Sequence, residues 1–201
     1  MPIQSAPVIP PLRRRPRAWL FAALFAGLGL LSLRAEVPTE YRVKAAFLFN
    51  FTKFVEWPPE RFPGRDAPIV IAVLGRNPFG PDLENIVRDR LVNGRPIRVR
   101  LLASATEARA EPTPIHILFV AAGEEQLLAD TADAPACKGA LTVGESSRFA
   151  ALGGVVNFVV LENRVHFEIS RAGTATASIK ISAQLQRLAQ PARFLRLSTP
   201  P

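Results

Sequence analysis

The sequence predicts an α/β protein, a single three-layer domain with a mixed, largely parallel sheet of about six strands flanked by helices. Three observations predict this class. Continuous apolar runs such as residues 69–74 are typical of strands that are buried on both faces. These runs alternate with segments of helical pattern, as they do when helices cover both faces of a parallel sheet. The last two runs are separated by Glu162, Asn163 and Arg164, a connection short enough for an antiparallel hairpin.

Residues 1–35 are predicted to be a signal peptide for export. An arginine-rich start at residues 13–17 precedes an uncharged, apolar run at residues 18–33. That run is shorter than the roughly 20 residues of a membrane-spanning helix and fits the apolar region of a secretory signal. We expect cleavage after Ala35 and a periplasmic protein, with an uncleaved N-terminal anchor as the alternative.

Much of the positive charge of the chain lies in this predicted signal. The formal net charge is +8, but residues 1–35 hold five arginines and no acidic residue, so the remainder carries 20 basic and 17 acidic residues. A nucleic-acid-binding surface is therefore not predicted, because it needs cationic residues clustered on the folded domain. The predicted domain covers residues 36–190, and residues 191–201 form a polar C-terminal tail.

Cys137 is the single cysteine of the chain, so no internal disulfide can form. It stands between Ala136 and Lys138, next to Gly139, in a segment typical of a loop. We therefore expect this thiol to contribute little to packing and to be dispensable.

The first element of the domain is predicted to be a helix that begins near Pro38 and Thr39. Its aromatic and aliphatic side chains recur at steps of three and four residues, which places them on one helix face that we expect to pack in the core. Pro58 and Pro59 are expected to end the helix after Trp57, because a proline ring has no backbone donor.

The remaining elements follow from apolar runs, turn residues and helix-capping residues. In chain order they are a strand at 69–74, a helix at 82–90, strands at 96–102 and 115–120, a helix at 123–132, a strand at 140–143, a short helix starting at Ser146 or Ser147, strands at 155–161 and 165–169, and a helix at 172–189.

Two glycine-containing turns each follow a predicted strand, at residues 75–80 and 144–149. Open α/β sheets usually bind their ligands in a crevice at the carboxyl ends of the strands, so both turns could line one. The candidate residues for a ligand or partner crevice are Asn77, Phe79, Gly144, Glu145, Ser146 and Phe149.

No metal site and no cofactor are predicted. A metal site needs several His, Cys or acidic ligands at suitable spacing, and the chain has only His116 and His166, on different predicted strands. Residues 75–80 follow a strand but match neither the dinucleotide fingerprint nor the phosphate-binding loop.

Gly144, Glu145 and Ser146 are the most enzyme-like feature of the sequence. A nucleophile elbow needs glycine both two residues before and two residues after the serine, and Arg148 stands at the second of these positions. A serine hydrolase would also need His166 as its base. We predict that the protein is not an enzyme, and keep a hydrolase built on Ser146 as the least favoured alternative.

Several segments together resemble the YfiR-like family, and they cover nearly all of the chain after the predicted signal. They are residues 41–58, 71–75 with 77–80, 116–120, 141–146 with Phe149, 153–154 with 157–158, 165–169, and 180–185.

The resemblance implies a periplasmic α/β protein that represses a membrane-bound diguanylate cyclase. Family members bind the periplasmic sensor region of the cyclase and lower cyclic-di-GMP in the cell, and they can act with an outer-membrane lipoprotein. One departure concerns Cys137, because well-understood members carry cysteine pairs. Control by an internal disulfide is therefore not expected here.

One functional alternative stays open besides a hydrolase. The domain could be a periplasmic sensor of a small ligand that uses the crevice at the strand ends. The sequence also leaves open a homodimer, the identity of the partner and the surface that binds it.

Overall fold

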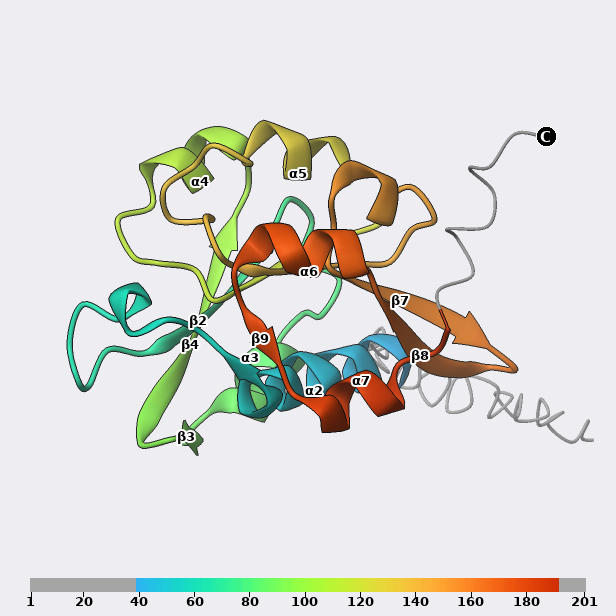
Figure 1. Ribbon diagram of the computed structural model, residues 1–201, viewed down its shortest axis with the longest axis horizontal. Helices are drawn as coiled ribbons and strands as arrows, with labels where there is room; N and C mark the ends of the chain where they lie inside the picture. The colour runs from blue at the N-terminus through green and yellow to red at the C-terminus, as the bar shows by residue number, and fades with distance from the viewer. Residues whose placement is uncertain (1–38, 192–201) are drawn as a thin grey trace, which may run out of the picture. The chain divides into compact units, whose positions relative to one another are not determined.

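The computed structural model describes residues 39–191, and the predicted signal peptide at 1–35 lies outside them. Of the predicted tail, only Pro191 is among the described residues. Within this range the elements run from the helix α2 to the helix α7 (Figure 1).

The central sheet confirms the mixed, largely parallel α/β class. Its strand order is β3-β4-β2-β5-β6-β7-β8, and β4, β2, β5, β6 and β7 are parallel, whereas β3 and β8 are antiparallel edge strands. In chain order the strands are β2 Ile69–Leu74, β3 Leu91–Val92, β4 Arg95–Leu102, β5 Ile117–Val120, β6 Leu141–Gly144, β7 Val156–Leu161 and β8 Arg164–Ile169. The sheet has seven strands where the sequence predicted about six, because a turn at Asn93 and Gly94, both with positive φ, adds the short β3.

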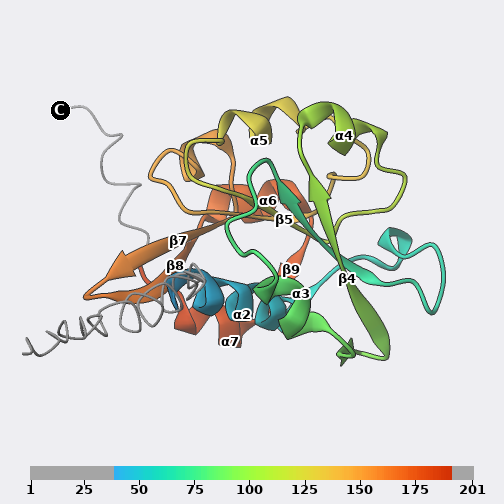
Figure 2. The same cartoon turned by 180° about the vertical axis from the view of Figure 1, so that it is seen from behind.

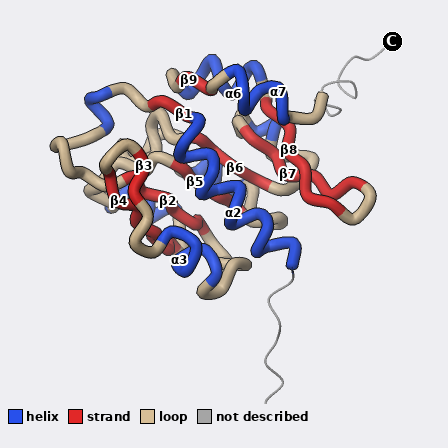
Figure 3. The backbone as a smooth tube through the Cα atoms, turned by 90° about the horizontal axis from the view of Figure 1, so that it is seen from below, coloured by secondary structure: helices blue, strands red, loops and turns tan. Residues whose placement is uncertain are grey.

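Alternate residues of β2 face two separate cores, which makes the domain three-layered. Ile71 packs in one core under α2 (Thr39–Phe54), α3 (Asp82–Val87) and α7 (Ala183–Leu188). Ala72 packs in the other core under α4 (Ala105–Ala110) and α5 (Gln126–Asp130). Figures 1 and 2 show the two groups of helices on opposite sides of the sheet, and Figure 3 shows α2 lying across its own side.

The first helix ends earlier than predicted. It starts at Thr39, as expected, but stops at Phe54, and Val55–Glu56 form the strand β1, which pairs antiparallel with β9 (Lys180–Ile181). The backbone N–H of Ser182 donates to the Phe54 carbonyl at 2.9 Å. Pairing with β9 thus replaces the last predicted turn of the helix. The position of Pro58 in the sequence gives no sign of this pairing.

The predicted helix at 172–189 is in fact two helices, α6 (Arg171–Ala177) and α7, separated by β9. Ser178 has a left-handed φ of 52°, which ends α6. Ile179 and Ile181 are buried and β-branched, as suits an extended segment. The Ser182 hydroxyl then accepts a hydrogen bond from the Leu185 N–H and starts α7.

The helix α4 was missed, although the sequence carries a signal for it. The Ser104 hydroxyl accepts from the Glu107 N–H, and the Glu107 carboxylate accepts from the Ala103 N–H at 2.8 Å. This arrangement is close to a capping box, whose pattern of Ser followed three residues later by Glu can be read directly. Two short 3-10 helices, at Pro59–Arg61 and Ala150–Leu152, complete the elements; the second lies within the predicted short helix after Ser146.

Candidate functional site

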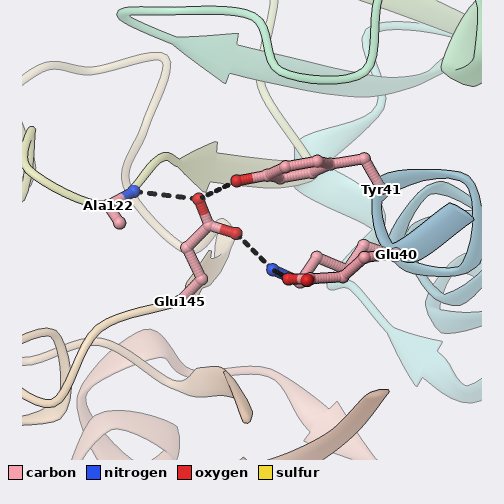
Figure 4. Close-up of polar contacts among 5 residues, drawn as sticks. Glu40, Tyr41, Ala122 and Glu145 are labelled. Carbon is pink, nitrogen blue, oxygen red and sulfur yellow. Dashed lines mark hydrogen bonds and ion pairs between the residues drawn. The ribbon is translucent and has the colours of Figure 1, made fainter. Parts of the chain in front are cut away.

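Glu145, at the carboxyl end of β6, is the centre of a buried polar cluster. Its Oε1 accepts hydrogen bonds from the Tyr41 hydroxyl at 3.1 Å and from the Ala122 N–H at 2.9 Å, and its Oε2 accepts from the Lys44 ammonium at 2.6 Å. Figure 4 shows the carboxylate between Ala122 and Tyr41. The cluster therefore ties the ends of β5 and β6 to the start of α2.

Lys44 lies between two carboxylates and is 3% exposed. Its ammonium contacts Glu145 at 2.6 Å and Glu40, one helical turn earlier on α2, at 2.5 Å. Burial lowers the pKa of Lys44, but the hydrogen bonds to Glu145 and Glu40 outweigh it and leave the pKa raised. Burial and the nearby Glu145 also raise the pKa of Tyr41. At neutral pH the Lys44 side chain is therefore charged, and the Tyr41 hydroxyl keeps its proton and donates a hydrogen bond to Glu145.

A pocket of about 390 Å³ opens beside this cluster, where β7 runs past the end of β6. Asn157 and Glu168 are paired across β7 and β8, line the pocket, and are both at most 5% exposed. No donor of the described chain reaches the buried Asn157 Oδ1 oxygen. Glu145 and Ser146 line the same pocket, so two of the six candidate residues lie together here.

Asn77 and Phe79 do not line this pocket, but Phe79 packs against Tyr41, which does. The Asn77 side chain accepts a hydrogen bond from the Phe79 N–H at 3.0 Å, which shapes the turn after β2. Phe79 is completely buried, and its ring packs edge-on against Tyr41 and Phe119. Asn77 thus shapes the turn that carries Phe79, and Phe79 packs against the ring of Tyr41, whose hydroxyl reaches Glu145.

Gly144 and Phe149 are explained by packing. A β-carbon on Gly144 would lie 2.3 Å from the Phe149 ring, and one on Gly154 would lie 2.1 Å from it. The ring is completely buried between these two glycines. Gly144 is thus required by a close approach of a ring, with no need for a nucleophile turn.

The geometry does not favour a hydrolase. The Ser146 hydroxyl lies beside Glu125 and is the largest cause of that residue's lowered pKa. His166 Nδ1 lies 3.3 Å from the amide nitrogen of Gln190, and within residues 39–191 no hydrogen bond joins His166 to Ser146. A nucleophilic serine needs a base within hydrogen-bond reach.

The usual ligand position of such a sheet is filled by the chain itself. After β2 the chain crosses to α3 on one face, and after β5 it crosses to α5 on the other, so the switch point lies between these strands. There the Glu124 carboxylate accepts from the Arg76 N–H at 3.0 and 3.1 Å. A β-carbon on Gly75, which has a φ of 81°, would overlap Glu124.

His116 is a neutral, buried side chain of the sheet. Its Nδ1 accepts from the Val70 N–H at 3.1 Å, and its ring lies between Trp57 and Phe62. Burial, and then the charges of Arg61 and Arg95, lower its pKa to about 4. The described residues contain no group of three or more His, Cys, Asp or Glu side chains that could hold a metal ion.

Sequence reasoning missed Tyr41, Lys44, Asn157 and Glu168 as members of the site. The spacing of Glu40 and Lys44, four residues apart on one helix, was a readable signal for an ion pair. The contact of Lys44 with Glu145 joins residues 101 positions apart and depends on the tertiary fold.

Fold and site together define a three-layer α/β protein with a small polar pocket at its strand ends. The chain belongs to the YfiR/HmsC-like family, whose model matches residues 41–190, from the first turn of α2 to the end of the described domain. No curated protein matches the sequence significantly. YfiR-like proteins are periplasmic regulators of diguanylate cyclases. None of the helices between residues 39 and 191 is long and apolar enough to cross a membrane.

Proposed function

We propose that this protein binds the periplasmic sensor region of an inner-membrane diguanylate cyclase and represses it, which lowers cyclic-di-GMP in the cell. The observation that carries the proposal is the family match over residues 41–190. An outer-membrane lipoprotein that sequesters the repressor is the second partner we propose, and export depends on a signal peptide cleaved after Ala35.

The geometry of the polar cluster supports a role in binding. Lys44 and Glu145 satisfy each other and anchor α2 to the sheet, so they give rigidity to the surface around them. A rigid surface is what such a regulator needs, because it can shift a sensor equilibrium only by its differential affinity for the two sensor states.

The surface we propose for the cyclase is the end of the sheet formed by the β7–β8 hairpin. β6 pairs with β7 only at Val156 and Asn157, so the rest of the hairpin extends beyond its neighbour (Figure 1). Val160 is 49% exposed there. β8 is an edge strand, and among residues 39–191 its outer side is paired by Gln190 at Phe167 and Glu168. The rest of this edge can accept a strand of a partner.

Co-purification with the periplasmic region of the cyclase, together with cyclic-di-GMP measurement, tests the proposal. Deleting the gene should raise cyclic-di-GMP, and repression should saturate with the amount of repressor. Val160→Glu should weaken the complex at least about tenfold, as for a buried interface anchor that costs more than about 1.4 kcal/mol. Leu91→Glu is the matched control, because Leu91 is 66% exposed at the opposite edge of the sheet.

An unchanged cyclic-di-GMP level on deletion, with no complex, would defeat the repressor proposal. Equal effects of Val160→Glu and Leu91→Glu would defeat only the assignment of the surface. N-terminal sequencing of the periplasmic fraction tests cleavage at Ala35 separately.

One observation favours a second candidate, a sensor of a small ligand. The buried Asn157 Oδ1 oxygen beside the Glu145 pocket would accept a hydrogen bond from a ligand donor. Native mass spectrometry of the protein released gently from the periplasm should then detect a bound molecule that Asn157→Leu loses. Identical spectra of the two proteins, without added mass, would remove this candidate.

A further inference from the structure

A second and larger pocket, of about 600 Å³, lies on the other side of the sheet from α2. It is bounded by α6, the end of α5, the segment 137–140 before β6, and Arg61 of the 3-10 helix at Pro59–Arg61. Pockets of about 300–1,000 Å³ are the size that proteins use for small organic molecules. The pocket shares no residue with the Glu145 cluster.

The pocket exists because α6 is made of small residues. After Arg171 the helix consists of alanine, glycine and threonine, and Gly173 is its one buried residue. A β-carbon on Gly173 would lie 2.6 Å from the Gly154 carbonyl oxygen, so the helix touches the domain closely at this point. Away from Gly173, α6 has no large side chain to fill the space beneath it.

The walls of the pocket are largely apolar. Leu118, Leu128 and Val155 line it. The two buried or half-buried threonine hydroxyls are already used: that of Thr131 donates to the Leu127 carbonyl at 2.8 Å, and that of Thr142 accepts from the Val155 N–H at 3.0 Å. These walls suit an apolar body.

The charged residues that line the pocket are both cationic, Arg61 and Lys138, and no Asp or Glu is among its lining residues. One end of the Arg61 guanidinium donates to the carbonyls of Ile115 and Ala136, both at 2.8 Å. Its Nε is buried, and no acceptor of the described chain reaches it.

Arg61 Nε lies close to Gly139, one of the residues that line the pocket. A β-carbon built on Gly139 would lie 3.9 Å from Arg61 Nε and 3.5 Å from the Ala177 carbonyl oxygen at the end of α6. A buried guanidinium N–H without an acceptor costs folding free energy, so a ligand with an anionic oxygen that accepts its hydrogen bond would be favoured there.

From this combination we propose that the pocket under α6 binds a small carboxylic acid with an apolar body, whose carboxylate lies at Arg61 and Lys138. The proposal is independent of the cyclase complex. It adds a chemical input to the domain, on a different side of the sheet from the Glu145 cluster.

Cys137 gives a direct reporter of occupancy. It is the single cysteine of the chain, lines the pocket and is 8% exposed. The rate at which methyl methanethiosulfonate modifies the purified exported protein is measured with 3-phenylpropanoate, 3-phenylpropan-1-ol or 3-phenylpropylamine. These probes share one apolar body and differ in charge. The acid should protect Cys137 at concentrations at least about tenfold lower than the amine.

Three variants and one control assign the effect. Arg61→Met should remove the preference for the acid, whereas Arg65→Met, an exposed arginine outside the pocket, should retain it. Because Arg61 also bonds two carbonyls, its loss could unfold the domain, so Lys138→Met provides a milder change at an exposed residue. Thr176→Phe, at a position of α6 that lines the pocket, should narrow the pocket and abolish protection by all three probes.

Equal protection by acid, alcohol and amine would overturn the proposal, and so would no protection by the acid. Protection that survives Thr176→Phe in a folded protein would place the ligand elsewhere and overturn it as well. None of these outcomes alters the cyclase proposal, which is measured by complex formation and cyclic-di-GMP.

Discussion

On one side of the sheet α2 buries Leu48 and Phe51 completely, whereas on the other side α6 buries Gly173 alone. The aromatic rings of Phe47 and Phe51 pack against Phe158 and Phe167 across the first side. The second side retains a pocket of about 600 Å³. The two sides of one sheet are therefore packed differently: the α2 side is filled by large side chains and is rigid, whereas the α6 side retains an open pocket.

The largest effect is expected at the polar end of the α2 side. Lys44→Met should lower the free energy of unfolding by about 3–5 kcal/mol, because it leaves the Glu145 carboxylate, which is 3% exposed, without its cation. Urea denaturation measures this. The double variant Lys44→Met with Glu145→Gln should recover part of the loss.

Lys53→Met is the control for this change, since Lys53 lies on the same helix but is exposed. It should change the free energy of unfolding by less than about 0.5 kcal/mol. A similar small change for Lys44→Met would mean that the α2 side does not depend on the ion pair.

The fold class could be predicted from the sequence because its signals are local. The apolar run of β2 and the short turn between β7 and β8 both appear in the structure as expected. The split of the last helix could not be predicted, since β9 exists by pairing with β1, more than one hundred residues earlier. The site was only partly predictable for the same reason: Glu145 stands in a strand-end motif, but Lys44 reaches it only in the folded chain.

Next in size is an overpacking change at Phe149, in the core on the α6 side. Gly144→Ala should cost about 2–3 kcal/mol in free energy of unfolding, because the new β-carbon would lie 2.3 Å from a ring that is completely buried. Thermal and urea unfolding measure it. Gly64→Ala is the matched control, since nothing lies within 4 Å of the added carbon. If both changes leave the free energy of unfolding unchanged, the core on the α6 side has enough free space around Phe149 to accept an added methyl group.

A pH dependence is expected from His116, which lies near Arg61 at the border of the large pocket. Its pKa falls from the ordinary 6.5 to about 4, first through burial and then through the charges of Arg61 and Arg95. Between these values the unfolded chain binds a proton that the folded protein does not, so stability falls as the pH drops from about 6.5 toward 4.

The loss attributable to His116 is on the order of 2 kcal/mol over this range. His116→Asn should flatten the slope of unfolding free energy against pH in that window relative to the wild type, whatever its effect at pH 8. Parallel slopes for the two proteins would show that the histidine is not held neutral by its surroundings.

The smallest effect concerns Cys137. The structure confirms that it lies in a turn but corrects the expectation that it contributes little to packing. The thiol is 8% exposed and belongs to the second core, and burial raises its pKa to about 11. Because it also borders the large pocket, part of its surface has no close neighbour, so Cys137→Ala removes fewer contacts than truncation in a filled core. We expect a loss of about 1 kcal/mol in unfolding free energy.

Leu48→Ala on the α2 side should cost about 2–5 kcal/mol by the same denaturation assay. Comparable losses for the two truncations would contradict the difference between the two sides of the sheet.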